Sequence, residues 1–249
     1  MKILVCLGNV PDTTTRVKFG NEGSALDKSG IQWIINPWDE LALTRAIELQ
    51  EDGTNPVSTV TVITAGDAGT EPTIRKALAI GADDAIRINT DPLDSYTVAA
   101  QIAASVKDKN FDIIMCGVES SDYNGLSVGG MVAELLGIPS VSSVSSLTFD
   151  GGQVEVTREI DGGREIVTLA TPFLAVVQKG IAKEPRIPAM RGIMMARKKA
   201  LEVLPPVSVE SMASFSGFEL PAPKPPCRMI QPDNVMELVE LLQNEARIL

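Results

Sequence analysis

Short apolar runs alternate with segments of helical periodicity through the first half of the chain. The apolar runs have the length and the Gly, Asp or Asn boundaries that are typical of strands buried on both faces of a parallel sheet. They cover residues 3–7, 60–65, 85–88 and 113–116. The helical segments cover residues 38–51, 71–80, 94–106 and 126–136. This strand–helix alternation predicts an α/β fold with a doubly wound, mostly parallel sheet.

Beyond Pro139 the pattern changes to an alternation of polar and apolar residues. Residues 154–159 and 165–169 alternate in this way on either side of Asp161-Gly162-Gly163. A turn signal between two β-prone segments predicts a β-hairpin, here over residues 153–170.

The remaining segments suggest where the α/β domain ends. Residues 140–146 are small and polar, whereas residues 173–177 form one more buried strand. We expect the α/β domain to span residues 1–184. Residues 185–249 contain many prolines, which prevent an independent core and predict an extended C-terminal arm. An amphipathic helix over residues 234–247 closes this arm, and it is expected to lie either on another protein or back on its own domain.

Composition narrows the classes of function. The chain has 22 Lys+Arg against 32 Asp+Glu, a net charge of −10, and only 4% aromatic residues. This balance disfavours nucleic acid as a partner. No apolar run is long enough to span a bilayer, so the chain is not expected to be embedded in a membrane. Cys6, Cys116 and Cys227 lack a metal or redox spacing, which favours a reduced, cytoplasmic bacterial protein without a metal site.

The chain contains no histidine. This excludes Ser–His–Asp and Cys–His nucleophiles and imidazole acid–base chemistry. There is also no G-x-x-x-x-G-K-[ST] phosphate loop, and no G-x-G-x-x-G follows the first apolar run. We therefore predict no catalytic residues, and the sequence favours binding over turnover.

Ligands of doubly wound folds bind beyond the carboxyl ends of the strands. The loops at that edge cover residues 8–13, 36–39, 65–70 and 117–130. The last loop is rich in glycine and serine and leads into a helix, whose N-terminal amides suit a phosphate. Ser120, Ser121, Asp122 and Asn124 are candidates for contacts with ribose or base edges. The alternative is a glycine-rich connection that serves only helix packing.

Several segments together resemble the beta subunit of the electron transfer flavoproteins. The resemblance spans nearly the whole chain, and its specificity comes from the order and spacing of the segments. They cover residues 36–40, 75–83, 116–117 with Asp122, 156–165 with Pro172, 184–186, 192–199 and 225–228.

The resemblance implies an adenine nucleotide alpha hydrolase-like fold and an electron carrier rather than an enzyme. In that family the alpha subunit of a heterodimer holds most of a redox-active FAD. The beta subunit supplies a wall beside the flavin and binds AMP, or a second FAD in electron-bifurcating members. The carrier would take electrons from acyl-CoA-type dehydrogenases of fatty acid β-oxidation and deliver them to a quinone oxidoreductase at the membrane.

The resemblance also assigns residues to these roles. The pocket for AMP or a second FAD would use Cys6, Asn36, Pro37, Trp38, Asp39, Ala65, Gly117, Val118, Glu119, Ser120, Ser121, Asp122, Tyr123, Asn124, Gly125, Leu126, Ser127 and Val128. Trp38 and Thr13 would lie beside the FAD of the alpha subunit. A loop with Arg186, Met190, Arg191 and Ile193 would dock onto partner dehydrogenases, with Met190 as its apolar anchor. The proline-rich arm would wrap around the alpha subunit.

The sequence departs from the family in the nucleotide loops. Gly8 and Val118 stand where the family often has lysine, and residues 126–128 match neither the ordinary nor the bifurcating pattern in full. We favour AMP because residues 158–163 and 191–196 resemble those of the ordinary carriers more closely. A second FAD is the alternative. An alternative from another class is an ATP-binding or ATP-hydrolysing stress-type domain.

Overall fold

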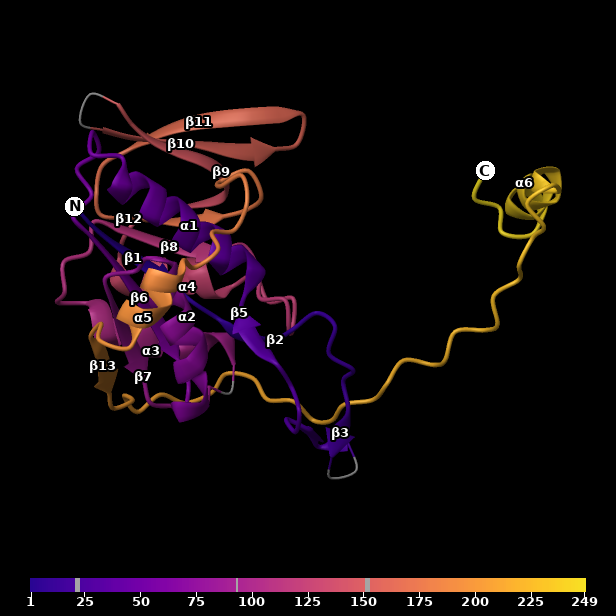
Figure 1. Cartoon of the computed structure of the whole chain (residues 1–249), viewed down its shortest axis with the longest axis horizontal. Coiled ribbons are helices and arrows are strands. Elements are labelled where there is room, and N and C mark those ends of the chain that lie inside the picture. The colour runs from indigo at the N-terminus through magenta and orange to yellow at the C-terminus, as the bar shows by residue number, and fades with distance from the viewer. Residues whose placement is uncertain (21–22, 93, 151–152) are drawn as a thin grey trace. The chain divides into compact units, whose positions relative to one another are not determined.

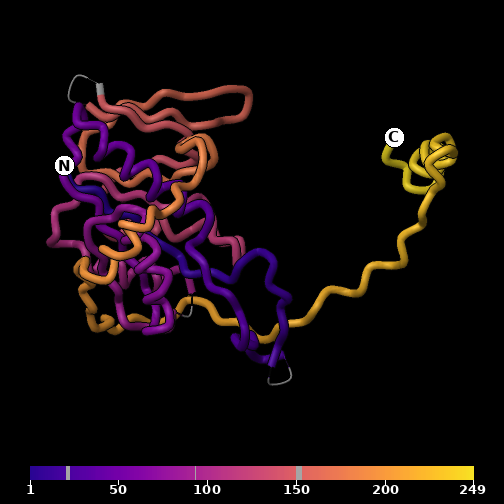
Figure 2. Tube along the Cα trace, in the orientation of Figure 1, coloured from indigo at the N-terminus to yellow at the C-terminus, as the bar shows by residue number. Residues whose placement is uncertain are grey.

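The chain is described here by a computed structural model that covers residues 1–20, 23–92, 94–150 and 153–249. It divides into two compact units. The first comprises Met1–Lys18 and Asp27–Ser216, and the second comprises Phe19–Leu26 and Gly217–Leu249. Figure 2 follows the chain through both units. The first unit extends past residue 184, where the sequence analysis ends the α/β domain.

The first unit is built on one large mixed sheet. Within the described residues its strand order is β11-β10-β9-β12-β8-β1-β6-β7-β13. The parallel strands are β1 (Lys2–Cys6), β6 (Thr59–Ala65), β7 (Asp84–Ile88), β8 (Ile113–Gly117), β12 (Phe173–Val177) and β13 (Leu201–Leu204). At one edge β9 (Ser140–Asp150) runs parallel to β12, and the antiparallel hairpin of β10 (Gln153–Ile160) and β11 (Gly163–Leu169) follows. The predicted α/β fold with a mostly parallel sheet is confirmed.

Helices cover both faces of this sheet (Figure 1). One face packs against α1 (Pro37–Glu51), α2 (Glu71–Ile80) and the short α5 (Met190–Ala196). The other face packs against α3 (Ser95–Val106) and α4 (Val128–Leu136). Side chains alternate along β1, so that Ile3 and Val5 enter the first layer and Leu4 and Cys6 enter the second. This explains why the central strands appear in the sequence as continuous apolar runs.

Two small antiparallel pairs complete the structure. In the first unit β2 (Asn9–Pro11) pairs with β5 (Trp33–Ile35), which leads directly into α1. In the second unit β3 (Phe19–Gly20) pairs with β4 (Ala25–Leu26), and α6 (Val235–Asn244) has no buried residue. All buried hydrophobic residues in the described part of the chain belong to the first unit.

Several elements were not predicted from the sequence, namely the short strands β2 to β5, and β9, α5 and β13. In β9 the buried residues Val141, Val144 and Leu147 are three apart, because the pairing shifts register twice. One shift, against β12, lies at Ser143, which adopts a positive φ of 58°, and the other, against β10, lies between Val144 and Ser146. These irregularities remove the alternation by which a strand is recognised. The helix α5 is too short for a clear period, and β13 is a four-residue edge strand.

Candidate nucleotide-binding site

The central feature of the site is Asp39, in the first turn of α1. One of its carboxylate oxygens, Oδ2, accepts hydrogen bonds from the Gly8 amide at 2.8 Å and from Asn36 Nδ2 at 3.1 Å. The other, Oδ1, accepts from the Gly117 amide at 2.7 Å. Gly8 follows the end of β1 and Gly117 ends β8, which is the neighbouring strand. Asp39 therefore joins α1 to the two adjacent strands between which the chain order of the sheet reverses.

That position is the topological switch point of a doubly wound sheet, where ligands bind in this class of fold. The strands β6 and β7 extend the sheet on one side of β1, whereas β8 returns to its other side. The connections therefore diverge at the carboxyl ends of β1 and β8.

Burial raises the pKa of Asp39 to about 6, although hydrogen bonds from Gly8, Gly117 and Asn36 favour the charged form and lower it. The nearby charge of Asp122 raises it further. The side chain is only 6% exposed. It is thus a positioning group that is held by two main-chain amides and by the side-chain amide of Asn36.

Asn36 fixes the loop that follows β8. Its Nδ2 also donates to the carbonyl oxygen of Glu119 at 2.8 Å, and its Oδ1 accepts from the amide of Ser121 at 3.2 Å. The loop also requires glycine at position 117, because a Cβ there would lie 2.7 Å from Asp39 Oδ1 and still closer to the side chain of Trp38. These contacts fix the loop after β8 against the start of α1.

The rest of the loop closes on itself. The amide of Ser120 donates to the carbonyl oxygen of Gly125 at 3.0 Å. Asp122 Oδ1 accepts from Ser120 Oγ at 2.5 Å and from the amide of Tyr123 at 2.8 Å. Asn124 adopts a positive φ of 52°, and its side chain and those of Asp122 and Tyr123 are exposed. We call residues 117–125 the nucleotide loop.

The nucleotide loop leads to the N-terminus of α4, which can bind an anion. The N-cap residue of α4, Ser127, makes no side-chain cap hydrogen bond. The first amides of a helix lack intrahelical partners, and the helix dipole favours negative charge beside them. Gly129 lets α4 approach the sheet closely, because a Cβ there would lie 2.5 Å from Cys116 Sγ and 2.8 Å from Val176 Cγ2. Leu126 and Ser127 are exposed and Val128 is half-buried. These features fit a phosphate.

Other predicted residues have distinct surroundings. Cys6 and Cys116 are buried in the layer between the sheet and α3 and α4, and burial raises the pKa of both thiols. At β1 a ligand would therefore meet main chain rather than a reactive sulfur. Ala65 ends β6 and is half-buried. Pro37 begins α1, and Val118 is fixed by its amide, which donates to the carbonyl oxygen of Val177 at 2.8 Å.

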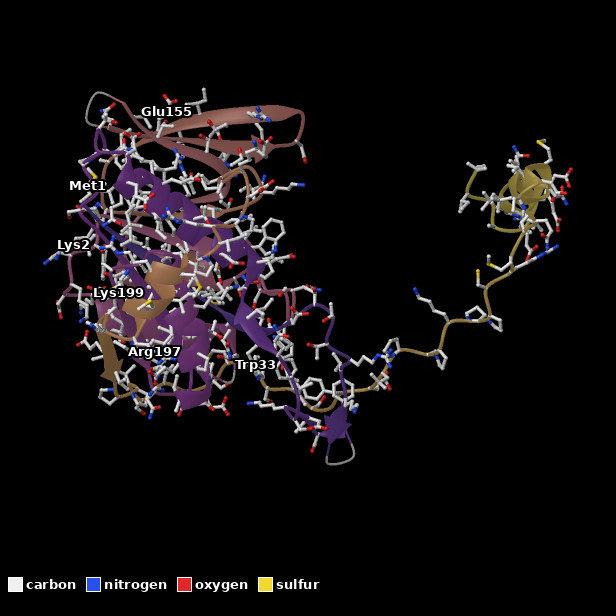
Figure 3. All side chains as sticks on the ribbon, in the orientation of Figure 1. Met1, Lys2, Trp33, Glu155, Arg197 and Lys199 are labelled. Atoms are coloured by element: carbon white, nitrogen blue, oxygen red, sulfur yellow. The ribbon has the colours of Figure 1, made fainter. Side chains whose placement is uncertain are left out.

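The two residues assigned to the flavin side lie near the β2–β5 pair. Trp38 is half-buried at the start of α1, and Thr13 is exposed in the turn that follows β2. The amide of Asp12 donates to the carbonyl oxygen of Gln32 at 2.8 Å and so ties this turn to the strand before α1. Figure 3 labels Trp33 on β5, where the same pair can be followed.

The predicted docking residues form a separate surface around α5. Arg186 makes a bidentate pair with Glu51 at 2.6 and 2.8 Å, and its amide donates to Thr44 Oγ1. Met190 is 77% exposed, and Ile193 and Arg191 are also exposed.

The exposed apolar side chains of α5 stand on a rigid support. A Cβ at Gly192 would overlap the carbonyl oxygen of Ala79, so α5 lies directly on α2. Arg75 donates to the carbonyl oxygens of Ala196 and Lys199 at 3.0 and 2.9 Å. Lys199 in turn donates to the carbonyl oxygen of Ala82 at 2.5 Å. Figure 3 labels Lys199 and Arg197 beside α5.

Two contacts beside the nucleotide loop were missed by the sequence analysis. Phe215 stacks on Tyr123 of the loop, and Asp94 binds the amides of Met212 and Ala213, just before Phe215. No local pattern marks either contact, because the partners lie far apart in the sequence.

Comparison with known proteins supports the family resemblance inferred from the sequence. The electron transfer flavoprotein domain matches residues 24–208, which is more than half of the chain. The electron transfer flavoprotein subunit beta of Syntrophomonas wolfei is 35% identical over 226 residues, which cover 90% of this chain and 87% of that protein. The chain belongs to the electron transfer flavoprotein beta-subunit family.

Other members of the family match along their whole length. The electron transfer flavoprotein subunit beta of Bacillus subtilis is 32% identical over 264 residues, with both chains covered completely. The human electron transfer flavoprotein subunit beta is 28% identical over 255 residues, which cover 100% of this chain and 99% of the human protein. The recognition made from the sequence motifs is confirmed.

No helix in the described part of the chain combines the length and apolar character needed to cross a membrane. The described residues also contain no group of three or more Cys, Asp or Glu side chains arranged to hold a metal ion.

Proposed function

We propose that the chain is the beta subunit of a heterodimeric electron carrier, in which it binds AMP and forms a wall beside an FAD held mainly by the alpha subunit. The observation that carries the AMP site is the uncapped N-terminus of α4 behind the nucleotide loop, at the switch point between β1 and β8. The FAD would supply the redox chemistry by accepting and passing on electrons.

The residues of the chain would bind and orient. The amides at the start of α4 would receive the phosphate, and the exposed polar side chains of the nucleotide loop would face ribose and base. Asp39 and Asn36 would act indirectly, by positioning the loop. The carboxylate of Asp39 and the side-chain amide group of Asn36 already bind main-chain groups of the loops around the site. Trp38 and Thr13 would lie on the side of the flavin.

The surface around α5 would bind the electron donors. Its methionines are exposed and flexible, so they can fill apolar pockets of different shapes on acyl-CoA-type dehydrogenases. Arg186 and Arg191 would add charge at its rim. The quinone oxidoreductase would be the acceptor. We place the complex in the cytoplasm, in keeping with three free cysteines.

A second FAD in place of AMP is the alternative, and Val128 favours it because bifurcating relatives often carry valine at that position. The two readings differ in stoichiometry. The chain should be co-expressed with its alpha subunit, purified as a complex, and extracted with acid. We expect one FAD and one AMP per heterodimer.

Each other result has a defined meaning. Two FAD per heterodimer would establish the bifurcating alternative. A complex without any bound adenine nucleotide in the beta subunit would contradict the proposed site. Hydrolysis of ATP by the isolated chain would support the stress-type alternative instead.

A further inference from the structure

The first part of the arm, residues 185–216, belongs to the first unit and ends beside the nucleotide loop. After β13 the chain runs along α3, where Gln101 pairs with both backbone groups of Val207 at 2.7 and 2.9 Å. Further along, Asp94 Oδ2 accepts hydrogen bonds from the amides of Met212 and Ala213 at 2.6 and 2.8 Å. The hydrogen bond from the amide of Thr97 lowers the pKa of Asp94 most, and the amides of Ala213 and Met212 lower it further.

The two carboxylate oxygens of Asp94 bind different segments. Its other oxygen, Oδ1, accepts from the amide of Thr97 at 2.7 Å and caps α3. One carboxylate thus joins the start of a core helix to residues 211–213 of the arm. We call residues 211–216 the arm root.

The arm root ends in an aromatic contact with the nucleotide loop. Phe215 stacks on Tyr123 with ring centroids 4.8 Å apart and an interplanar angle of 23°. Each residue is somewhat more than half exposed, so the contact covers only part of each ring. The returning side of the loop also lies near α3, because a Cβ at Gly125 would be 3.7 Å from Ser95 Oγ.

The two ends of the nucleotide loop are held differently. Its first half is fixed to α1 by Asn36, which binds Glu119 and Ser121. Its tip is held by the bonds of Asp122 within the loop and by the ring of Phe215. The tip therefore depends on a residue that belongs to the arm.

We infer that Phe215 and Asp94 are positioning residues of the nucleotide site, and that nucleotide binding and the seating of the arm root favour each other. This inference rests on the proposed function. A seated arm root holds Tyr123 and with it the tip of the loop. By thermodynamic linkage, a nucleotide that binds the held loop must favour the seated arm root by the same factor. The site and the segment that leads to the partner-binding arm would thus be coupled.

The test uses AMP binding to the full-length chain, measured by calorimetry. Stacked aromatic pairs contribute enough that Phe215→Ala should weaken AMP binding roughly 2- to 10-fold, and Phe215→Tyr should restore it. The matched control is Phe218→Ala, which removes the same ring from the same arm. Phe218 stacks on Phe19 instead, with centroids 5.3 Å apart, so AMP binding should be unchanged.

A second measurement follows the arm root itself. In the wild-type chain, saturation with AMP should slow hydrogen exchange at the amides of Met212 and Ala213, which bind Asp94. The slowing should be smaller in Phe215→Ala. A ring with a purely structural role would change exchange equally with and without AMP.

The outcomes separate the two proposals. If neither AMP nor FAD binds to the wild-type chain, alone or in the complex with its alpha subunit, the proposed function fails. If it binds AMP but Phe215→Ala binds equally well, or if Phe218→Ala weakens binding as much, the coupling is overturned while the site stands. Absence of an AMP effect on Met212 and Ala213 exchange in the wild-type chain would also overturn it.

Discussion

At the scale of single residues, the buried carboxylate of Asp39 connects α1 to the ends of two neighbouring strands by hydrogen bonds. Its two oxygens receive three hydrogen bonds from three separate segments, and together these bonds offset part of the cost of removing the carboxylate from water. An asparagine would have the same shape. Its amide group, however, would turn a donor toward the amide of Gly8 or Gly117.

We therefore expect Asp39→Asn to destabilise the chain by about 1–3 kcal/mol at pH 5, because a buried main-chain donor loses its acceptor. The size of the effect should depend on pH. The pKa of Asp39 is raised from 3.8 to about 6 in the folded chain. The folded state thus binds more protons than the unfolded state between these values, and stability falls as pH rises through this range.

The difference in unfolding free energy between wild type and Asp39→Asn should accordingly shrink by up to about 3 kcal/mol from pH 4 to pH 7. Urea unfolding of both proteins at several pH values measures it. Other acidic groups titrate in both proteins, so their contributions cancel in the difference. A difference that stays constant or grows with pH would contradict the assigned environment of Asp39.

At the scale of elements, the close packing of α4 on the sheet positions the amides of its first turn. Two adjacent glycines in this helix have opposite surroundings. A Cβ at Gly129 would meet Cys116 and Val176, whereas a Cβ at Gly130 would meet nothing within 4 Å. Valine on a buried strand cannot turn aside easily, so an added methyl group must move the helix.

We expect Gly129→Ala to lower the stability by about 1–3 kcal/mol, and Gly130→Ala to raise it by about 0.5–1 kcal/mol through better helix propensity. Thermal unfolding of the two variants under identical conditions tests the pair. The neighbour is a control for helix propensity. Equal effects of the same sign would show that α4 does not rely on close contact at Gly129.

The same scale shows what sequence patterns can predict. The central strands were predicted because strands buried on both faces appear as continuous apolar runs. The helices α1 to α4 were predicted from their helical periodicity and because Pro37, Gly81 and Gly137 mark helix boundaries. The strand β9 was missed because its bulge at Ser143 disturbs the alternation. The short α5 and β13 acquire their structure from contacts with α2 and β7, which lie far away in the sequence.

The candidate site also has a part that could be predicted and a part that could not. The nucleotide loop could be predicted as a loop because glycines and small polar residues follow a strand and precede a helix. Its contact with Phe215 could not be predicted, because no residue near Tyr123 in the sequence indicates it. The local sequence around Asp94 indicates only a helix cap. Such contacts depend on how the chain returns through space, which local propensity does not encode.

At the scale of the whole molecule, the two units differ in how they are stabilised. The first unit has a layer of core on each face of its sheet. Within its described residues the second has a two-stranded pair, one aromatic stack and a helix with no buried residue. Exposed apolar residues at helical spacing, such as Val235 and Leu238, are typical of a surface that a partner covers.

This difference leads to a last expectation, for a chain that ends at Ser216. The truncated chain keeps the whole described core, the clamp of Asp94 and the Phe215–Tyr123 stack. Its melting temperature should stay within about 2 °C of the full chain, which corresponds to less than about 1 kcal/mol for a protein of this size. Association with the alpha subunit should be lost, because residues 217–249, the second half of the arm that would wrap it, are removed. Calorimetry and co-purification measure the two results independently. A large drop in melting temperature would show that the second unit contributes to the core, and retained association would place the main subunit contact on the first unit instead.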